Sequence, residues 1–228
     1  MTSSVAFSNF VGVAVDDPNN PALATSNYNI PHRFTFRLGY SAYWWGDNRT
    51  NFTLIGASNK GRPFSYTYSD NDGSVFGDNL DGRHLLYVPD GPNDPLVMYA
   101  EGFDQAAFFE ALAKTGLDKY AGRIAPRNSF NSNWWTYYDL RIEQEFPAFK
   151  EGHKFAGWIT IKNLCNLINN EWCVLEEASY PRNQGIADVA LSPDGSQYIY
   201  TEFVQPPGQG RVSQPSSWEI VIGLSYRF

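Results

Sequence analysis

The residue types that most often do chemistry in proteins are few in this chain, and they are scattered. The three histidines are His32, His84 and His153, and none belongs to a metal-binding spacing such as H-E-x-x-H. The sequence contains neither a G-x-S-x-G nucleophile elbow nor a glycine-rich loop of the kind that holds phosphate. We therefore expect a protein that is not an enzyme and that uses no cofactor.

The two cysteines, Cys165 and Cys173, are eight positions apart, at the end of one predicted strand and in the segment beyond it. In an oxidising compartment a disulfide between them would tie down the base of that segment. Two free, partly buried thiols are the alternative that the spacing leaves open. Because there is no third cysteine and no histidine nearby, we expect no zinc site.

An acidic segment, "SDNDGSVFGDNLDGR", contains Asp70, Asp72, Asp78 and Asp81. A group of carboxylates suggests calcium, but the EF-hand pattern D-x-[DN]-x-[DN]-G fails because Gly73 directly follows Asp72. Solvated turns are the simpler interpretation. A loose extracellular calcium site remains the alternative.

Composition argues against one class of partner. The 228 residues include 17 Lys or Arg and 24 Asp or Glu, a net charge of −7, so we expect no nucleic-acid partner. No run of apolar residues reaches the length of about 18 that a membrane helix needs. The mean hydropathy of −0.40 resembles that of soluble proteins, but alternating membrane strands average to similar values. The first ten residues, "MTSSVAFSNF", show no secretion signal.

Five segments of about ten residues alternate between apolar and polar side chains, which predicts long β-strands. They lie near residues 33–42, 51–60, 134–146, 154–164 and 218–228. In the second segment, the residues 61–63 interrupt the alternation like a bulge or bend before it resumes at Phe64. A single helix is predicted over 105–116, with Asp104 as its N-cap and Gly116 at its end. A hairpin is predicted to turn at residues 193–195.

The connections between these strands are alternately short and long, which is typical of an outer-membrane β-barrel. The apolar face of the last strand would then meet lipid, through Trp218, Ile220, Ile222, Leu224, Tyr226 and Phe228. Charged residues of the opposite faces would line the lumen, namely Arg37, Asp139, Arg141, Glu143, Lys162, Glu219 and Arg227. They are candidates for a ligand path or, more simply, for ion-pair ladders that fix the strand register. A soluble β-sandwich also alternates, but globular strands average only about 5–6 residues.

Several stretches of the chain resemble the C-terminal barrel region of TonB-dependent outer-membrane receptors, in particular the Oar-like branch. The matching stretches are "DPNNPALATSNYNIPHRFTFRLGY", "GRPFSYTY", "LLYVPDGPNDP", "GLDKYAGRIAPRNSF", "YYDLRIEQEFP", "NLCNLINNEW" and "SWEIVIGLSYRF". Together they span nearly all of residues 1–228, in order. The resemblance implies an all-β fold, in which an antiparallel meander forms the C-terminal part of a transmembrane β-barrel, with long extracellular loops and one short loop helix.

The resemblance also implies location and partners. Receptors of this family lie in the outer membrane of Gram-negative bacteria and import scarce ligands, using energy relayed by TonB. They combine a plug domain with a barrel of about 22 strands. The terminal aromatic strand is implied to be the segment that the barrel-assembly machinery recognises.

These residues contain no plug and no TonB-contacting segment, so we expect an incomplete barrel whose contacts with plug and TonB require a missing N-terminal part. The long segments 69–132 and 165–216 are the better candidates for binding the unknown ligand. Two alternatives remain: a soluble β-sandwich binding module, and a surface or adhesion protein anchored by the barrel without transport.

Overall fold

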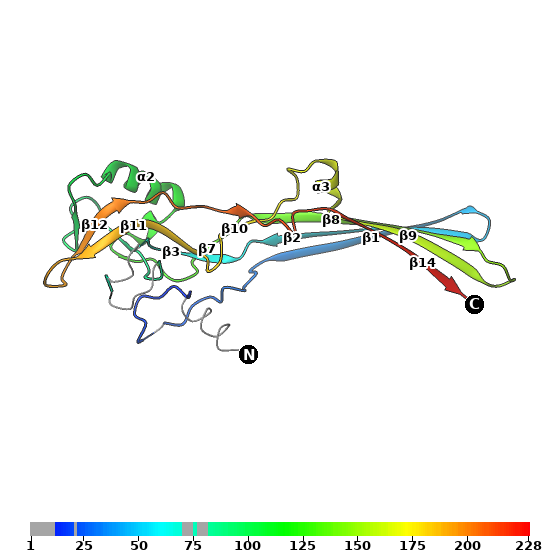
Figure 1. Cartoon of the computed structure of the whole chain (residues 1–228), viewed down its shortest axis with the longest axis horizontal. Helices are drawn as coiled ribbons and strands as arrows, with labels where there is room; N and C mark the ends of the chain where they lie inside the picture. The colour runs from blue at the N-terminus through cyan, green and yellow to red at the C-terminus, as the bar shows by residue number, and fades with distance from the viewer. Residues whose placement is uncertain (1–11, 21, 70–74, 77–81) are drawn as a thin grey trace. The chain divides into compact units, whose positions relative to one another are not determined.

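The computed structural model describes residues 12–20, 22–69, 75–76 and 82–228 (Figure 1). The chain forms two compact units, each assembled from three separate stretches of sequence. Unit 1 contains Met1–Asn29, Arg62–Ser132 and Ala178–Gly210, and unit 2 contains Ile30–Gly61, Asn133–Glu177 and Arg211–Phe228. Most regular structure in both units is β-strand, so the expected all-β class is confirmed.

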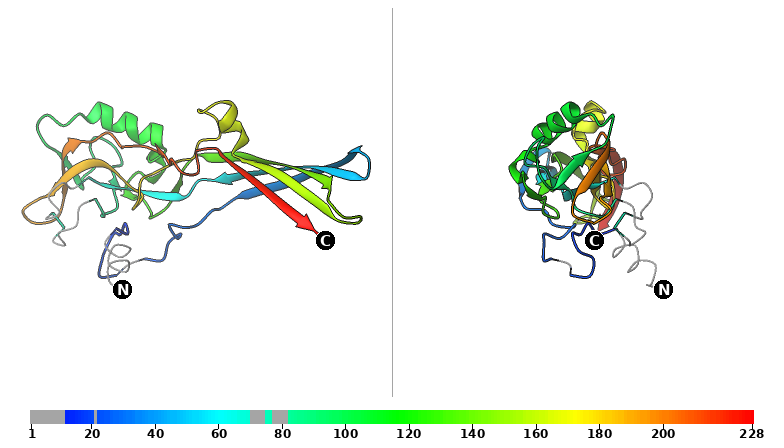
Figure 2. Two further views of the ribbon diagram at one scale, coloured as in Figure 1. Left: turned by 45° about the vertical axis from the view of Figure 1, so that its right-hand side comes forward. Right: turned by 90° about the vertical axis from the view of Figure 1, so that its left-hand side faces the viewer.

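Unit 2 contains a five-stranded antiparallel sheet in the order β1-β2-β8-β9-β14. The strands are β1 (Arg33–Trp45), β2 (Asn48–Lys60), β8 (Trp134–Pro147), β9 (Lys154–Lys162) and β14 (Glu219–Arg227). The five strands have the same order in the sheet as along the chain, so the sheet is a meander. The terminal strand β14 forms one edge, next to β9 (Figure 2). The five long strands predicted from alternation are therefore confirmed.

The short connections of this sheet lie at one end and the long ones at the other. Trp45 is opposite Asn48, so β1 and β2 are joined by a two-residue turn in which Gly46 has φ of 56°, as tight hairpins require. At the opposite end, Lys60 pairs with Trp134, and Lys162 pairs with Glu219. The asymmetry in connection length that the sequence suggests is thus present in the sheet.

Unit 1 contains a second sheet, in the order β5-β12-β11-β3-β7. Its strands are β3 (Pro63–Tyr68), β5 (Val97–Tyr99), β7 (Phe130–Asn131), β11 (Asn183–Leu191) and β12 (Tyr198–Phe203). The remaining elements of the chain are β4 (Tyr87–Val88), α2 (Gln105–Thr115), η1 (Asp118–Tyr120) and β6 (Arg123–Ile124) in unit 1, α3 (Leu164–Ile168) and β10 (Glu176–Glu177) in unit 2, and β13 (Gly210–Arg211) at the boundary of the two units along the chain. Unlike the sheet of unit 2, this one is mixed, because β3 and β11 run parallel, as do β5 and β12.

Two local predictions in unit 1 are confirmed. Helix α2 begins after Asp104, whose Oδ1 accepts a hydrogen bond of 2.9 Å from the Ala107 N–H, and it ends at Gly116 in the left-handed conformation with φ of 73°. Strands β11 and β12 form the predicted hairpin, with Leu191 opposite Tyr198. Local side-chain chemistry is sufficient to fix both features.

Two expectations about the connections are wrong. The long segments were expected to be loops, but parts of both fold together around a core that includes Tyr68, Leu86, Phe108, Ile186 and Tyr200. The strand that resumes at Phe64 was expected to continue the second strand of the meander, yet β3 belongs to the other sheet. Gly61 and Arg62 separate β2 from β3, which begins at Pro63, and every residue of β3 is buried. Burial of aromatic area explains why β3 leaves the first sheet.

Hydrogen bonds between tyrosines connect the strands of this core. The Tyr200 hydroxyl donates to the backbone oxygen of Tyr87, and the Tyr68 hydroxyl accepts from the Tyr87 N–H at 3.3 Å. The Tyr87 hydroxyl donates to Oδ2 of Asp94 at 2.9 Å. Burial, together with this carboxylate, raises the pKa of Tyr87 to about 12. The tyrosines therefore stay neutral, and their polar atoms are satisfied inside an aromatic core.

Candidate functional site

The sheet of unit 2 presents one apolar face on which large side chains are exposed. The exposed fraction is 65% for Phe34, 62% for Leu38, 44% for Ile159 and 75% for Ile222, and Leu140 is half-buried. Within the described residues of unit 2, no second sheet covers this face. The predicted lipid-facing residues of the last strand are all at least 43% exposed, namely Trp218, Ile220, Ile222, Leu224, Tyr226 and Phe228.

Aromatic rings gather on this face towards both ends of the sheet. At the end with the short connections, Trp44 packs against Phe52 with ring centroids 5.6 Å apart, and Tyr226 packs against Phe155 at 5.0 Å. At the other end, Phe34 stacks on Trp134 at 6.0 Å. Two aromatic bands separated by aliphatic residues are typical of strands that cross a membrane.

Two polar pairs interrupt the apolar face, and the groups of each satisfy one another. Ser58 is opposite Thr136, and their hydroxyl oxygens are 2.8 Å apart. Thr50 is opposite Gln144, and the threonine hydroxyl donates to Oε1 of the glutamine at 2.5 Å. The glutamine Nε2 in turn donates to the backbone oxygen of Glu145 at 2.7 Å. Internal pairing of this kind lowers the cost of polar groups on a surface without water.

The opposite face is polar, and the register places all seven predicted lumen-facing charges on it. Most of them form ion pairs. Arg141 Nη2 lies 2.7 Å from Glu143 Oε2, and Lys162 Nζ lies 3.0 Å from Glu219 Oε2. The first pair lies within β8, whereas the second joins β9 to β14. The Lys162–Glu219 pair therefore fits the simpler of the two roles expected for the charges, the fixing of strand register.

A carboxylate that was not among the candidates, Glu145, is the centre of a larger charge cluster. It is 6% exposed and has three cationic neighbours on different strands: Lys154 at 3.0 Å, Arg227 at 3.6 Å and Arg49 at 3.7 Å. Alternation assigns Glu145 to the polar face, but its partners come from β2, β9 and β14. Only knowledge of the strand register could have identified the cluster.

Asp139 has a structural partner at the base of the segment that follows β9. Its Oδ1 accepts a hydrogen bond of 2.9 Å from the backbone N–H of Asn163, which adopts φ of 51° at the start of α3. Cys165 and Cys173 form a disulfide in the structure, with Cα atoms 6.0 Å apart. The backbone oxygen of Cys173 also accepts from Trp135 Nε1 at 3.0 Å. Asp139 and the disulfide therefore fix the same turn on β8.

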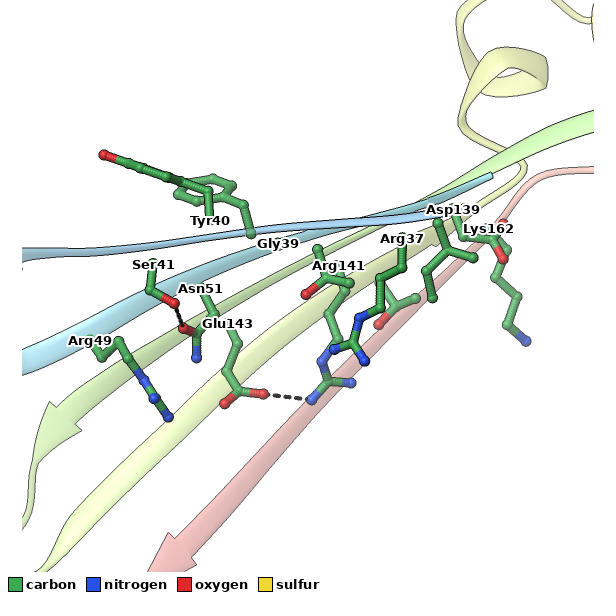
Figure 3. Close-up of a pocket in the computed structure, with 14 residues that line it drawn as sticks. Arg37, Gly39, Tyr40, Ser41, Arg49, Asn51, Asp139, Arg141, Glu143 and Lys162 are labelled. Atoms are coloured by element: carbon green, nitrogen blue, oxygen red, sulfur yellow. Dashed lines mark hydrogen bonds and ion pairs between the residues drawn. The ribbon is translucent and has the colours of Figure 1, made fainter. Parts of the chain in front are cut away.

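The polar face is hollowed into a groove with a volume of about 630 Å³. Figure 3 shows the side chains of its charged residues pointing to the same side of the sheet. The groove is lined by Arg37, Gly39, Tyr40, Ser41, Arg49, Asn51, Phe52, Thr53, Ile55, Asp139, Arg141, Glu143, Thr160 and Lys162. Five of the seven predicted lumen residues thus share one cavity, whereas Glu219 and Arg227 lie outside its lining.

The remaining predictions concern the acidic segment, metal binding and membrane helices. The acidic residues Asp70, Asp72, Asp78 and Asp81 lie outside the described residues. In the described part of the chain, no three His, Cys, Asp or Glu side chains are arranged to hold a metal ion. No helix there has both the length and the apolar composition to cross a bilayer.

Comparison of the chain with family models, with curated proteins and with solved structures finds no match.

Proposed function

We propose that unit 2 forms part of the wall of a β-barrel in a Gram-negative outer membrane. We further propose that the protein takes part in the energy-coupled passage of a ligand, as the TonB-dependent receptors that it resembles do. The observation that carries this proposal is a sheet whose exposed face is apolar and whose opposite face is charged. Large exposed apolar patches on proteins mark contact with lipid or with other proteins.

The strands have suitable lengths for this role. They contain 13, 13, 14, 9 and 9 residues, and a tilted transmembrane strand needs about 9–11. The additional residues of β1, β2 and β8 would extend beyond the hydrocarbon region. A soluble β-sandwich is less well supported, because it would bury the apolar face against a second sheet.

The edges of the sheet limit how such a barrel could close. Strands β1 and β14 are the outer strands of five antiparallel ones, so they run in the same direction. Unpaired backbone groups at both edges would be costly in lipid. An antiparallel barrel therefore requires an odd number of further strands between β14 and β1. The complete barrel would then have an even number of strands, as bacterial outer-membrane barrels do.

The proposed orientation can be tested with two arginine substitutions on β14. Ile222 is in the middle of the strand on the apolar face, and Ser225 is on the polar face, opposite Ala156. An arginine at the centre of a lipid-facing strand costs about 2–4 kcal/mol. We expect Ile222→Arg to abolish or strongly reduce insertion of the folded chain into vesicles, and Ser225→Arg to leave it nearly unchanged.

Insertion is measured by the quenching of tryptophan fluorescence in vesicles that contain brominated lipids. The wild-type chain should be quenched, because Trp44 and Trp218 are exposed on the sheet. Equal sensitivity to the two substitutions would contradict the assigned faces. A wild-type chain that stays unquenched and dissolved without detergent would contradict the membrane proposal itself.

A further inference from the structure

One arginine in the polar groove, Arg37, has no anionic partner among the residues that the structure describes. Arg37 lies on β1 and is exposed, and the groove lining includes its side chain. No carboxylate in the described part of the chain lies within ion-pair distance of its guanidinium. Arg141 also lines the groove, and Figure 3 shows the side chains of both arginines on the same side of the sheet. Cations that share one groove repel one another, and an anion bound between them would offset that repulsion.

The carboxylates of the groove are already engaged. Glu143 pairs with Arg141 at 2.7 Å, and Asp139 accepts the hydrogen bond from the Asn163 N–H. Lys162, the remaining cation at that end, pairs with Glu219. Neither carboxylate that lines the groove forms an ion pair with Arg37 in the described part of the chain.

The arrangement around Arg141 leaves room for an additional acceptor. Its guanidinium lies over the Trp158 ring, 4.6 Å from the ring centroid, which fixes the plane of the guanidinium. Glu143 is bonded to Nη2, and an arginine has five N–H donors in all. Further along the groove, Ser41 donates to Oδ1 of Asn51 at 2.7 Å, so the amide of Asn51 turns its acceptor towards the serine and keeps its N–H donors available.

We propose that this groove binds the carboxylate or phosphate group of a small molecule, with Arg37 as the principal contact and Arg141 as the second. Guanidinium groups recognise both oxyanions through paired N–H donors. This proposal adds a ligand class to the proposed function. The binding site itself does not depend on transport, but the statement that the bound anion is the transported ligand rests on the proposed function. The groove is net positive although the chain as a whole carries a charge of −7, which favours an anion at this place over the rest of the surface.

The test is isothermal titration calorimetry on the full chain in a neutral detergent at low salt, with citrate and inorganic phosphate as separate probes and glucose as a neutral control. We expect at least one of the two anions to bind and glucose not to bind. Arg37→Gln should weaken anion binding by about tenfold or more, because it removes a charge-assisted hydrogen bond. Arg227→Gln is the matched control: it removes an arginine from the same face but outside the groove, and it should change the affinity less than twofold.

The proposal is overturned if the wild-type chain binds neither anion. It is also overturned if both arginine substitutions weaken binding equally, since that result indicates general charge attraction. Quenching by brominated lipids is measured on the same variants. Normal insertion without anion binding would refute this site alone. Anion binding by a chain that stays unquenched and dissolved without detergent would refute the membrane proposal and leave the site intact.

Discussion

Replacement of Glu145 by glutamine tests whether one shared carboxylate holds four strands of unit 2 in register. Glu145 is on β8, and its cationic neighbours are Arg49 on β2, Lys154 on β9 and Arg227 on β14. Its side chain is 7% exposed, whereas the three cations are 38% to 62% exposed. Glutamine keeps the size of the side chain and one acceptor oxygen but removes the charge.

The expected loss follows from the separate contacts. The hydrogen bond from Lys154 Nζ is 3.0 Å long, and a bond of this charged type contributes about 1.5–3 kcal/mol. The contacts with Arg49 and Arg227 are longer, at 3.7 and 3.6 Å, and their cations are well solvated, so each contributes about 0–1 kcal/mol. We therefore expect Glu145→Gln to lower the free energy of unfolding of unit 2 by about 2–4 kcal/mol.

Tryptophan fluorescence can follow unit 2 separately. All seven tryptophans of the chain belong to this unit, namely Trp44, Trp45, Trp134, Trp135, Trp158, Trp172 and Trp218. Urea unfolding at a fixed detergent concentration, monitored by tryptophan emission, therefore reports on the sheet that contains Glu145. The matched control is Glu219→Gln, which breaks an ion pair whose side chains are 52% and 60% exposed and which should cost less than about 1 kcal/mol.

The outcome that refutes this reasoning is a Glu145→Gln variant with an unchanged urea midpoint, or one that loses no more stability than the control. Either result would mean that solvent screens the cluster as fully as an exposed pair. A double replacement of Glu145 and Lys154 provides a second check, because the two changes should be clearly non-additive if their contact carries most of the energy.

Three further predictions concern single contacts. Gly223→Ala should destabilise unit 2 by about 1–3 kcal/mol, measured by the same urea titration, because a Cβ at this position would overlap the Trp158 ring; an unchanged midpoint would show that the ring moves freely. Joint replacement of Cys165 and Cys173 by serine should cost about 2–3 kcal/mol, since the disulfide closes a short loop; reduction of the wild-type chain should reproduce that loss, and a loss in only one of the two experiments would contradict it. Hydrogen bonds, first from the Ser192 hydroxyl, lower the pKa of Asp194 to about 2, so its support of the hairpin should be full above about pH 4 and disappear as the pH falls through 2; an NMR titration of its carboxyl with a midpoint near 4 would refute this.

The sequence was informative wherever the answer depended on neighbours in the chain. Alternation identified the five long strands and the face to which each side chain belongs, because side chains of a strand repeat every two residues. The cap of α2 by Asp104 and the hairpin before Tyr198 were predictable for the same reason, since both depend on contacts within a few residues. Transport, the membrane location and the partners named by the resemblance remain predictions.

Contacts between distant segments were decided only by the tertiary structure. Nothing local distinguishes Glu145 from the other acidic residues of β8, because its neighbours are 9 to 96 positions away. The core of unit 1 joins residues from stretches as distant as Tyr68 and Tyr200, and no sequence period links them. The sequence alone determined which face of each strand is apolar, since that follows from the order of residues. Only folding decided which charges meet and that no carboxylate of the described residues pairs with Arg37, because both depend on strand register and on long-range packing.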